Sequence, residues 1–153
     1  MCDAMLCGLA RWLRLAGLDT TFDSALDDAA LAAVARREGR WLLTRDRVLA
    51  ARAGPRVILL HRAGIAEQLA ELMGRLGLSF SPERFFTRCS LCNGELEEVP
   101  REVVVELVPP FVAAHASRFS RCASCGKVYW PGTHHARIQR RLDELLSAVG
   151  RKG

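Results

Sequence analysis

Hydrophobic residues in the first eighty positions follow two alternating patterns, one helical and one extended. Apolar residues three or four positions apart predict helices over residues 6–16, 29–38, 48–52 and 65–76. Two continuous apolar runs, Trp41–Thr44 and Val57–Leu60, are too short for helices and predict buried strands. Strands separated by helices form parallel sheets covered on both faces, so residues 1–80 are expected to form an α/β domain.

This pattern breaks near residues 79–83, and a different one follows. We expect a helix over Arg101–Leu107 that is stopped by Pro109-Pro110, an extended segment over Lys127–Trp130, and a final helix over Ala136–Val149. Residues 81–153 are therefore expected to form a second unit with an inserted helix and a C-terminal helix.

Four cysteines in two Cys-x-x-Cys pairs give the second unit its chemistry. They are Cys89, Cys92, Cys122 and Cys125, and each pair is followed closely by a glycine. Two residues between ligands let one turn present both sulfurs to the same ion, so the pairs predict a structural zinc ribbon. Disulfides or a redox-active pair are the alternatives, but disulfides require an oxidising compartment and a redox pair needs only one such motif.

Composition narrows the range of partners. The chain has 153 residues, half of them hydrophobic, and Lys plus Arg exceed Asp plus Glu by 22 to 17. That excess suits a nucleic-acid partner without requiring one. No apolar stretch is long enough to cross a bilayer and no secretory signal is visible, so we expect a cytoplasmic protein without a membrane partner.

Three aspartates fall where chemistry is expected in a parallel sheet. Asp3 precedes the first helix, Asp28 opens the second, and Asp46 follows the strand Trp41–Thr44. Loops after parallel strands gather at one edge, so these carboxylates are expected to meet there and to bind Mg²⁺ or Mn²⁺. Such a site would hydrolyse phosphodiester bonds. The competing interpretation is that Asp28 only caps its helix and Asp46 only makes a turn.

The segment from Asp28 through Gly39 to Thr44-Arg45-Asp46 is similar to the late signature of PIN-domain ribonucleases. Together with the start of the chain, Asp3 to Gly17, and with Tyr129-Trp130-Pro131-Gly132-Thr133-His134, it resembles the Mut-seven C-terminal ribonuclease family. The resemblance runs from Asp3 to about Arg137. It implies a PIN-like domain with a zinc ribbon, a ribonuclease activity and RNA as substrate.

Carried over residue by residue, the resemblance makes Asp3, Asp28 and Asp46 the catalytic acids. A further acid of larger PIN domains has no clear counterpart here, and Asp23 and Asp27 are the candidates. The position of several basic residues suggests substrate contacts independently of the resemblance. These candidates are Arg11, Arg14, Arg45, Arg47 and His134.

Taken together, these features predict a metal-dependent ribonuclease with structural zinc and catalytic Mg²⁺ or Mn²⁺. A non-catalytic zinc-ribbon module that binds RNA is the main alternative, and a zinc-stabilised interaction protein is a third. Neither alternative explains why acids would collect near phosphate. The oligomeric state stays open. Because Asp3 would end a strand with only two residues before it, we also expect the natural chain to begin further upstream.

Overall fold

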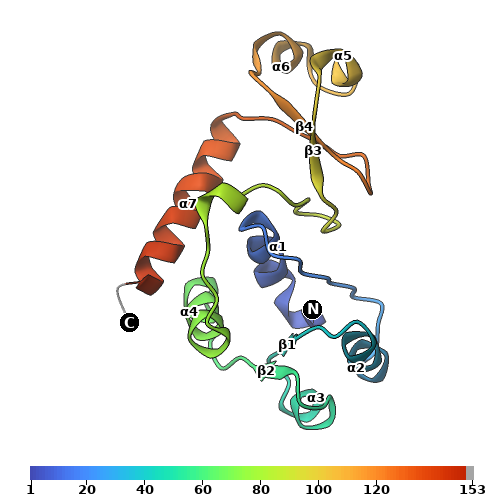
Figure 1. The fold of residues 1–153 in the computed structure, drawn as a ribbon, viewed down its shortest axis with the longest axis vertical. Coiled ribbons are helices and arrows are strands. Elements are labelled where there is room, and N and C mark those ends of the chain that lie inside the picture. Colours follow the sequence, from blue (N-terminus) through green and yellow to red (C-terminus); the bar gives the residue numbers. More distant parts are fainter. Residues whose placement is uncertain (151–153) are drawn as a thin grey trace.

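The computed structural model describes the backbone of residues 1–150 and side chains as far as residue 147 (Figure 1). Its elements are η1 (Ala4–Leu6), α1 (Cys7–Leu15), α2 (Asp28–Arg37), β1 (Leu42–Thr44), α3 (Arg47–Arg52), β2 (Val57–Leu59), α4 (Ile65–Leu76), η2 (Pro82–Arg84), β3 (Leu96–Val99), α5 (Arg101–Val104), α6 (Pro110–His115), β4 (Phe119–Cys122), β5 (Val128–Tyr129) and α7 (Thr133–Gly150).

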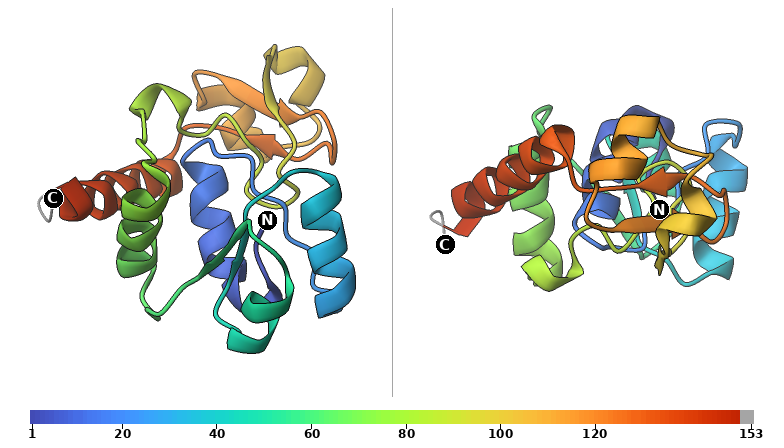
Figure 2. Two further views of the ribbon diagram at one scale, coloured as in Figure 1. Left: turned by 60° about the horizontal axis from the view of Figure 1, so that its bottom comes forward. Right: turned by 90° about the horizontal axis from the view of Figure 1, so that it is seen from above.

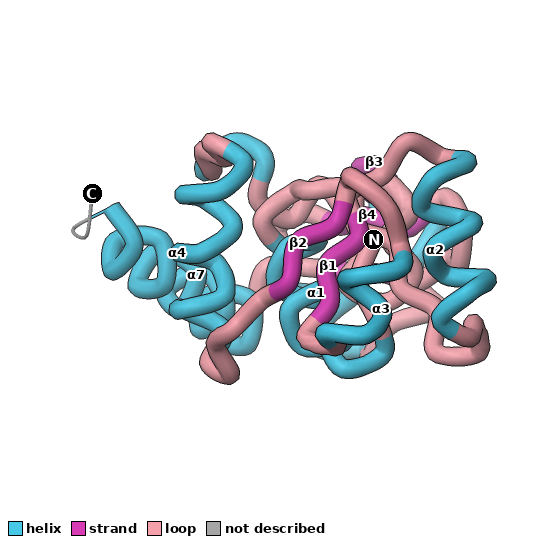
Figure 3. The backbone as a smooth tube through the Cα atoms, turned by 90° about the horizontal axis from the view of Figure 1, so that it is seen from below, coloured by secondary structure: helices cyan, strands magenta, loops and turns pink. Residues whose placement is uncertain are grey.

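A small parallel sheet organises the first half of the chain. β1 and β2 pair in parallel, with Leu43 opposite Ile58, and lie side by side in Figure 3. Cys2 forms parallel bridges to Leu43 on one side and to Phe22 on the other, so short extended segments continue the sheet beyond β1. The order across the sheet is therefore the Phe22 segment, the Cys2 segment, β1 and β2. All four run in the same direction, so the chain leaves each of them at the same edge.

Helices cover this sheet because each presents one apolar face to it. α1 and α4 bury their leucines on one core, which includes Leu9, Leu13, Leu69 and Leu72. On the other side, α2 and α3 pack with Leu42 around Leu31 and Leu49. The sequence-based prediction of a mixed α/β half with a parallel sheet is confirmed.

The part of the chain between α4 and α7, called the ribbon below, contains a separate antiparallel sheet in the order β3-β4-β5. α5 and α6 lie between β3 and β4 in sequence and close over a small core around Val104 and Phe119. The predicted helix was expected to continue to Leu107 and to be stopped by the two prolines, and both parts of this prediction are wrong. α5 ends at Val104, and Pro110 is the first residue of α6, a position where the missing N–H of proline costs nothing.

The last helix returns to the first half of the chain. α7 follows the ribbon in sequence but lies beside α4 (Figures 1 and 2). Leu145 belongs to the core formed by α1 and α4, and Leu142 is buried against Leu15 and Phe85. The ribbon is thus inserted between two helices that pack on each other.

Candidate functional site

Asp3 and Asp46 are joined at the edge of the parallel sheet by the hydroxyl of Thr44. Thr44 is fully buried; its Oγ1 donates to Oδ2 of Asp3 at 2.6 Å and accepts the backbone N–H of Asp46 at 2.9 Å. The backbone N–H of Asp3 also donates to the carbonyl of Leu43 at 3.0 Å. Asp3 itself is 7% exposed, so water cannot readily replace these bonds. Thr44 therefore fixes the carboxylate of Asp3 and the backbone of Asp46 at the ends of two adjacent segments of the sheet.

The free oxygens of these acids are the ones that matter for a ligand. Oδ1 of Asp46 caps α3 by accepting the N–H groups of Val48 and Leu49, at 2.6 and 2.9 Å. Asp46 thus has a structural role as a helix cap, but the cap engages only one of its two carboxylate oxygens. Asp46 is therefore both a cap and a candidate ligand.

The start of α2 separates the roles of two neighbouring aspartates. Asp27 is the N-cap, since its Oδ1 accepts the N–H of Ala30 at 2.8 Å. Asp28 is the first residue of the helix and is exposed, so the interpretation of Asp28 as the cap is wrong. Asp23, directly after the Phe22 segment, accepts the N–H of Ala25 at 2.9 Å in a local turn.

The strand order brings these acids to one edge but not into a tight cluster. Asp3, Asp23 and Asp46 follow three neighbouring parallel segments, and α2 starts from the same edge. Within the described residues, however, only the four cysteines place at least three ligand atoms within 4.8 Å of one another. The carboxylate oxygens fit Mg²⁺ or Mn²⁺ in their chemistry, and an ion would have to draw them closer.

The arginines expected to contact substrate lie in two different environments. Arg11, Arg45 and Arg47 are exposed, the last two on either side of Asp46 in the chain. Arg14 is only 5% exposed and donates to backbone carbonyls, which corrects the expectation that it faces the substrate. His134 is exposed in the first turn of α7, directly after the ribbon.

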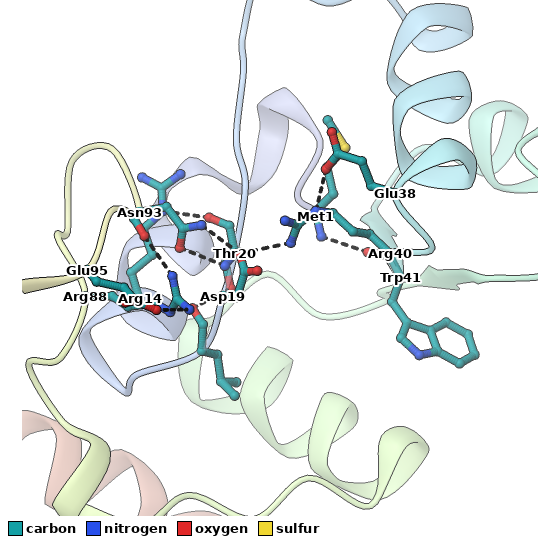
Figure 4. A network of polar contacts seen from close by, with 11 residues as sticks. Met1, Arg14, Asp19, Thr20, Glu38, Arg40, Trp41, Arg88, Asn93 and Glu95 are labelled. Atoms are coloured by element: carbon teal, nitrogen blue, oxygen red, sulfur yellow. Dashed lines mark hydrogen bonds and ion pairs between the residues drawn. The ribbon is translucent and has the colours of Figure 1, made fainter. Parts of the chain in front are cut away.

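Arg14 instead fastens the first half of the chain to the ribbon. Its Nε donates to the carbonyl of Thr20 at 2.7 Å (Figure 4). Its Nη1 donates to the carbonyl of Leu91 at 2.7 Å and makes a longer contact of 3.4 Å with the carbonyl of Ser90. Burial lowers the pKa of Arg14 from its ordinary value, but a guanidinium stays charged under all ordinary conditions. These charge-assisted bonds reach the turn between Cys89 and Cys92.

Asn93 completes this connection from the ribbon side. Its Oδ1 accepts the N–H of Thr20 at 2.8 Å, and its Nδ2 donates to Asp19 at 2.7 Å. Asp19 also pairs with Arg40 at 2.9 Å (Figure 4). Neither Asn93 nor Asp19 was identified from the sequence, because their partners are far away along the chain.

The four cysteines have the geometry of a tetrahedral thiolate site. Sγ of Cys89 lies 3.7 Å from that of Cys125, and Sγ of Cys92 lies 3.4 Å from that of Cys122. Four sulfurs at about 2.3 Å from one zinc ion would lie about 3.8 Å apart. The cluster could therefore hold zinc with little change, and none of these cysteines forms a disulfide.

The surroundings of the site favour a thiolate at Cys89. Burial alone would raise the pKa of this thiol, but the Tyr129 hydroxyl at 3.1 Å and backbone N–H groups lower it to about 6. Gly94 is required for space, because a Cβ there would lie 2.8 Å from Sγ of Cys122. Hydrogen bonds to the ligand atoms, such as the one between Tyr129 and Cys89, are typical of metal sites.

Comparison with known proteins identifies a family for this chain. No helix within residues 1–150 is long and apolar enough to cross a membrane. No curated protein and no solved structure matches the chain. The family model described as the Mut7-C RNAse domain matches residues 1–142, which is nearly the whole chain. The chain therefore belongs to the Mut7-C RNAse domain family.

Proposed function

We propose that this protein is a metal-dependent ribonuclease with a PIN-like catalytic domain, which hydrolyses RNA phosphodiester bonds at Asp3, Asp28 and Asp46. The observation that carries the proposal is the hydrogen-bonded chain from Asp3 through Thr44 to Asp46, at the sheet edge where parallel folds bind their ligands. Membership of an RNase domain family supports the same activity.

In this proposal the three carboxylates bind Mg²⁺ or Mn²⁺. The cap of α3 occupies only one oxygen of Asp46, whereas both oxygens of Asp3 accept hydrogen bonds, and the ion would replace the longer one, from the N–H of Met5 at 3.4 Å. A divalent cation there would act as a Lewis acid on the phosphodiester and would activate water. Thr44 orients Asp3 and Asp46, and Asp28 supplies a carboxylate from the first turn of α2. Asp23 is a better candidate for a fourth ligand than Asp27, because it directly follows the segment that pairs with Cys2.

The basic residues would bind the substrate and offset the charge of its backbone. Arg45 and Arg47 flank Asp46 and are exposed, as Arg11 is on α1. Contacts of this kind fix the position of a nucleic acid without reading its sequence. RNA is the expected partner, and His134 at the ribbon end of α7 is a candidate for a more distant contact.

The four cysteines would hold zinc in a structural role. The turn that carries Cys89 and Cys92 is also the turn that Arg14 binds through its carbonyls. Zinc would therefore fix both the ribbon and its attachment to the catalytic half. Metal binding can contribute on the order of 10 kcal/mol to a unit with so small a core.

Substitution of single carboxylates tests the catalytic proposal. Asp28→Asn and Asp46→Asn should each lower metal-dependent RNA cleavage by about 100-fold or more, since several kcal/mol of metal-dependent stabilisation would be lost. Both should fold normally, because Asp28 is exposed in the first turn of α2 and Asn caps α3 nearly as well as Asp46 does. Asp143 is an exposed residue of α7, so Asp143→Asn is the matched control and should cleave like the wild type.

The assay is cleavage of mixed RNA with Mg²⁺ or Mn²⁺ by proteins purified in parallel. Wild-type cleavage by both active-site variants would refute the site. RNA binding without any metal-dependent cleavage by the wild type would indicate the binding module instead.

A further inference from the structure

A hollow of about 240 Å³ opens beside the proposed catalytic carboxylates, where β1 and β2 end. It is lined by Arg45, Arg47, Leu59, Leu60 and His61. The N–H of Leu60 donates to the carbonyl of Thr44 at 2.8 Å, so the residues that follow the two strands leave the sheet side by side. The hollow is thus adjacent to Asp46 through its neighbours in the chain.

Two side chains around this hollow, those of Arg45 and Arg47, carry positive charge. Among the described residues, no ion pair involves Arg45 or Arg47. The larger hollow of about 520 Å³ on the other side of His61 is different, because Glu67 and Glu71 are part of its lining. An anion would therefore enter the smaller hollow in preference to the larger one.

Glu71 fixes the orientation of the His61 imidazole through its Nδ1 atom. Oε1 of Glu71 lies 2.9 Å from Nδ1, and Oε2 accepts the backbone N–H of the same histidine at 3.1 Å. Burial raises the pKa of Glu71, but the bonds from His61 and the charge of Arg75 outweigh this and lower the pKa below its usual value. An ionised carboxylate can only accept, so Nδ1 carries a proton and Nε2 is left for a ligand.

Gln68 fixes the backbone that follows His61. It is 3% exposed, and its Nε2 donates to the carbonyls of Arg62 and Ala63 at 3.0 and 3.3 Å. Two side chains of α4 thus hold one short loop in a defined position. Such support is expected where a loop must present a ligand-binding group.

We propose that this hollow binds a backbone phosphate of the RNA substrate, next to the phosphate that is cleaved, through Arg45, Arg47 and Nε2 of His61. The inference rests on the proposed function and extends it, since His61 was not among the residues identified from the sequence. One guanidinium can donate two parallel hydrogen bonds to phosphate oxygens, and Nε2 of His61 adds a further donor when it carries a proton. The hollow has no tryptophan, tyrosine or phenylalanine on which a base could stack, which favours the backbone over a base.

Binding of a labelled oligouridylate tests this assignment without cleavage of the probe. The measurement is made in an Asp28→Asn background at one fixed pH and at several salt concentrations. His61→Gln should weaken binding about tenfold and reduce the salt dependence of log K by about 0.7, the value for one lost phosphate contact with a single strand. His61→Arg should restore both. His115→Gln, on exposed α6, is the matched control and should change neither.

The outcomes separate this proposal from the proposed function. Unchanged affinity and salt dependence in His61→Gln, with the fold intact by thermal melting, would overturn the phosphate site. Weaker binding that His61→Arg does not restore would also overturn it, because only the shape of the loop would then have mattered. If the wild type binds RNA but does not cleave it, the nuclease fails while the comparison of variants still decides the phosphate site.

Discussion

Replacement of Thr44 by valine would test how the carboxylates are held at the sheet edge. Valine has nearly the size of threonine but lacks the hydroxyl that donates to Asp3 and accepts the N–H of Asp46. The substitution therefore removes two hydrogen bonds from a fully buried position and changes little else.

The expected cost follows from the surroundings of each bond. Asp3 is 7% exposed, so its carboxylate loses a bond that water cannot easily replace, at about 1.5–3 kcal/mol. Asp46 is half-buried, and its N–H can turn partly to water, which limits that loss to about 1 kcal/mol. We expect Thr44→Val to lower the free energy of unfolding by about 2–4 kcal/mol, or Tm by roughly 4–16 °C for a chain of this size.

Urea unfolding gives the stability, and RNA cleavage over a range of Mg²⁺ concentrations gives the effect on the site. Because Asp3 would no longer be fixed, the Mg²⁺ concentration for half-maximal cleavage should rise about tenfold. Thr87→Val is the matched control, since the Thr87 hydroxyl donates to the carbonyl of Arg84 at 2.7 Å on the exposed surface. A stability loss no larger than in this control, with normal Mg²⁺ dependence, would refute the reasoning.

Three further predictions concern other parts of the molecule. Elemental analysis of the wild type should find one zinc ion per chain, and no zinc or two ions would contradict the proposed site. Cys92→Ser should release the ion and lower hydrogen-exchange protection in the ribbon and at Thr20. Gly17→Ala should destabilise the fold by about 2 kcal/mol or more in urea unfolding, because Gly17 has φ +85° and a Cβ would overlap the carbonyl of Arg84. Gly74→Ala, in open space on α4, should instead stabilise by about 0.5–1 kcal/mol, and equal effects would count against the backbone argument. Burial raises the pKa of Glu71, but the hydrogen bonds from His61 outweigh this and hold it below the ordinary value in the folded state. The contribution of Glu71 to stability is therefore present above the ordinary pKa and is lost as the pH falls through the folded value. Glu71→Gln should accordingly flatten the acid side of a plot of urea midpoint against pH, and an unchanged slope would be evidence against the Glu71 interaction with His61.

The sequence predicts the parts of this molecule that depend on local spacing. Helical periodicity locates α1, α2 and α4, and apolar runs locate β1 and β2, to within one or two residues. The spacing of the cysteine pairs predicts their meeting in space, because two ligands on one turn and two on another leave few other solutions. The aspartates at the ends of strands follow from topology, but their distances from one another do not.

Arg14 shows what local spacing misses and what it could have revealed. Ala10, Leu13 and Arg14 share one helical face, and the first two are buried, so Arg14 was on the buried stripe of its helix. The pattern could have indicated burial, although not the carbonyls at Ser90 and Leu91 that compensate for it. The apolar face of α7 was likewise visible in the sequence, whereas its return to α4 was not.

The junction between Arg14 and the ribbon determines which positions tolerate substitution. Arg14 binds the carbonyl oxygens of Ser90 and Leu91, which every amino acid supplies, and the Leu91 side chain is 59% exposed. Position 91 should therefore tolerate most substitutions, whereas the Ser90 hydroxyl also lies 3.4 Å from the hydroxyl of Tyr129. Arg14 and Asn93 contribute through their side chains, and other side chains lack the length or the polar atoms needed to reach the same backbone groups. A library of variants should accordingly accept many residues at position 91 and very few at positions 14 and 93.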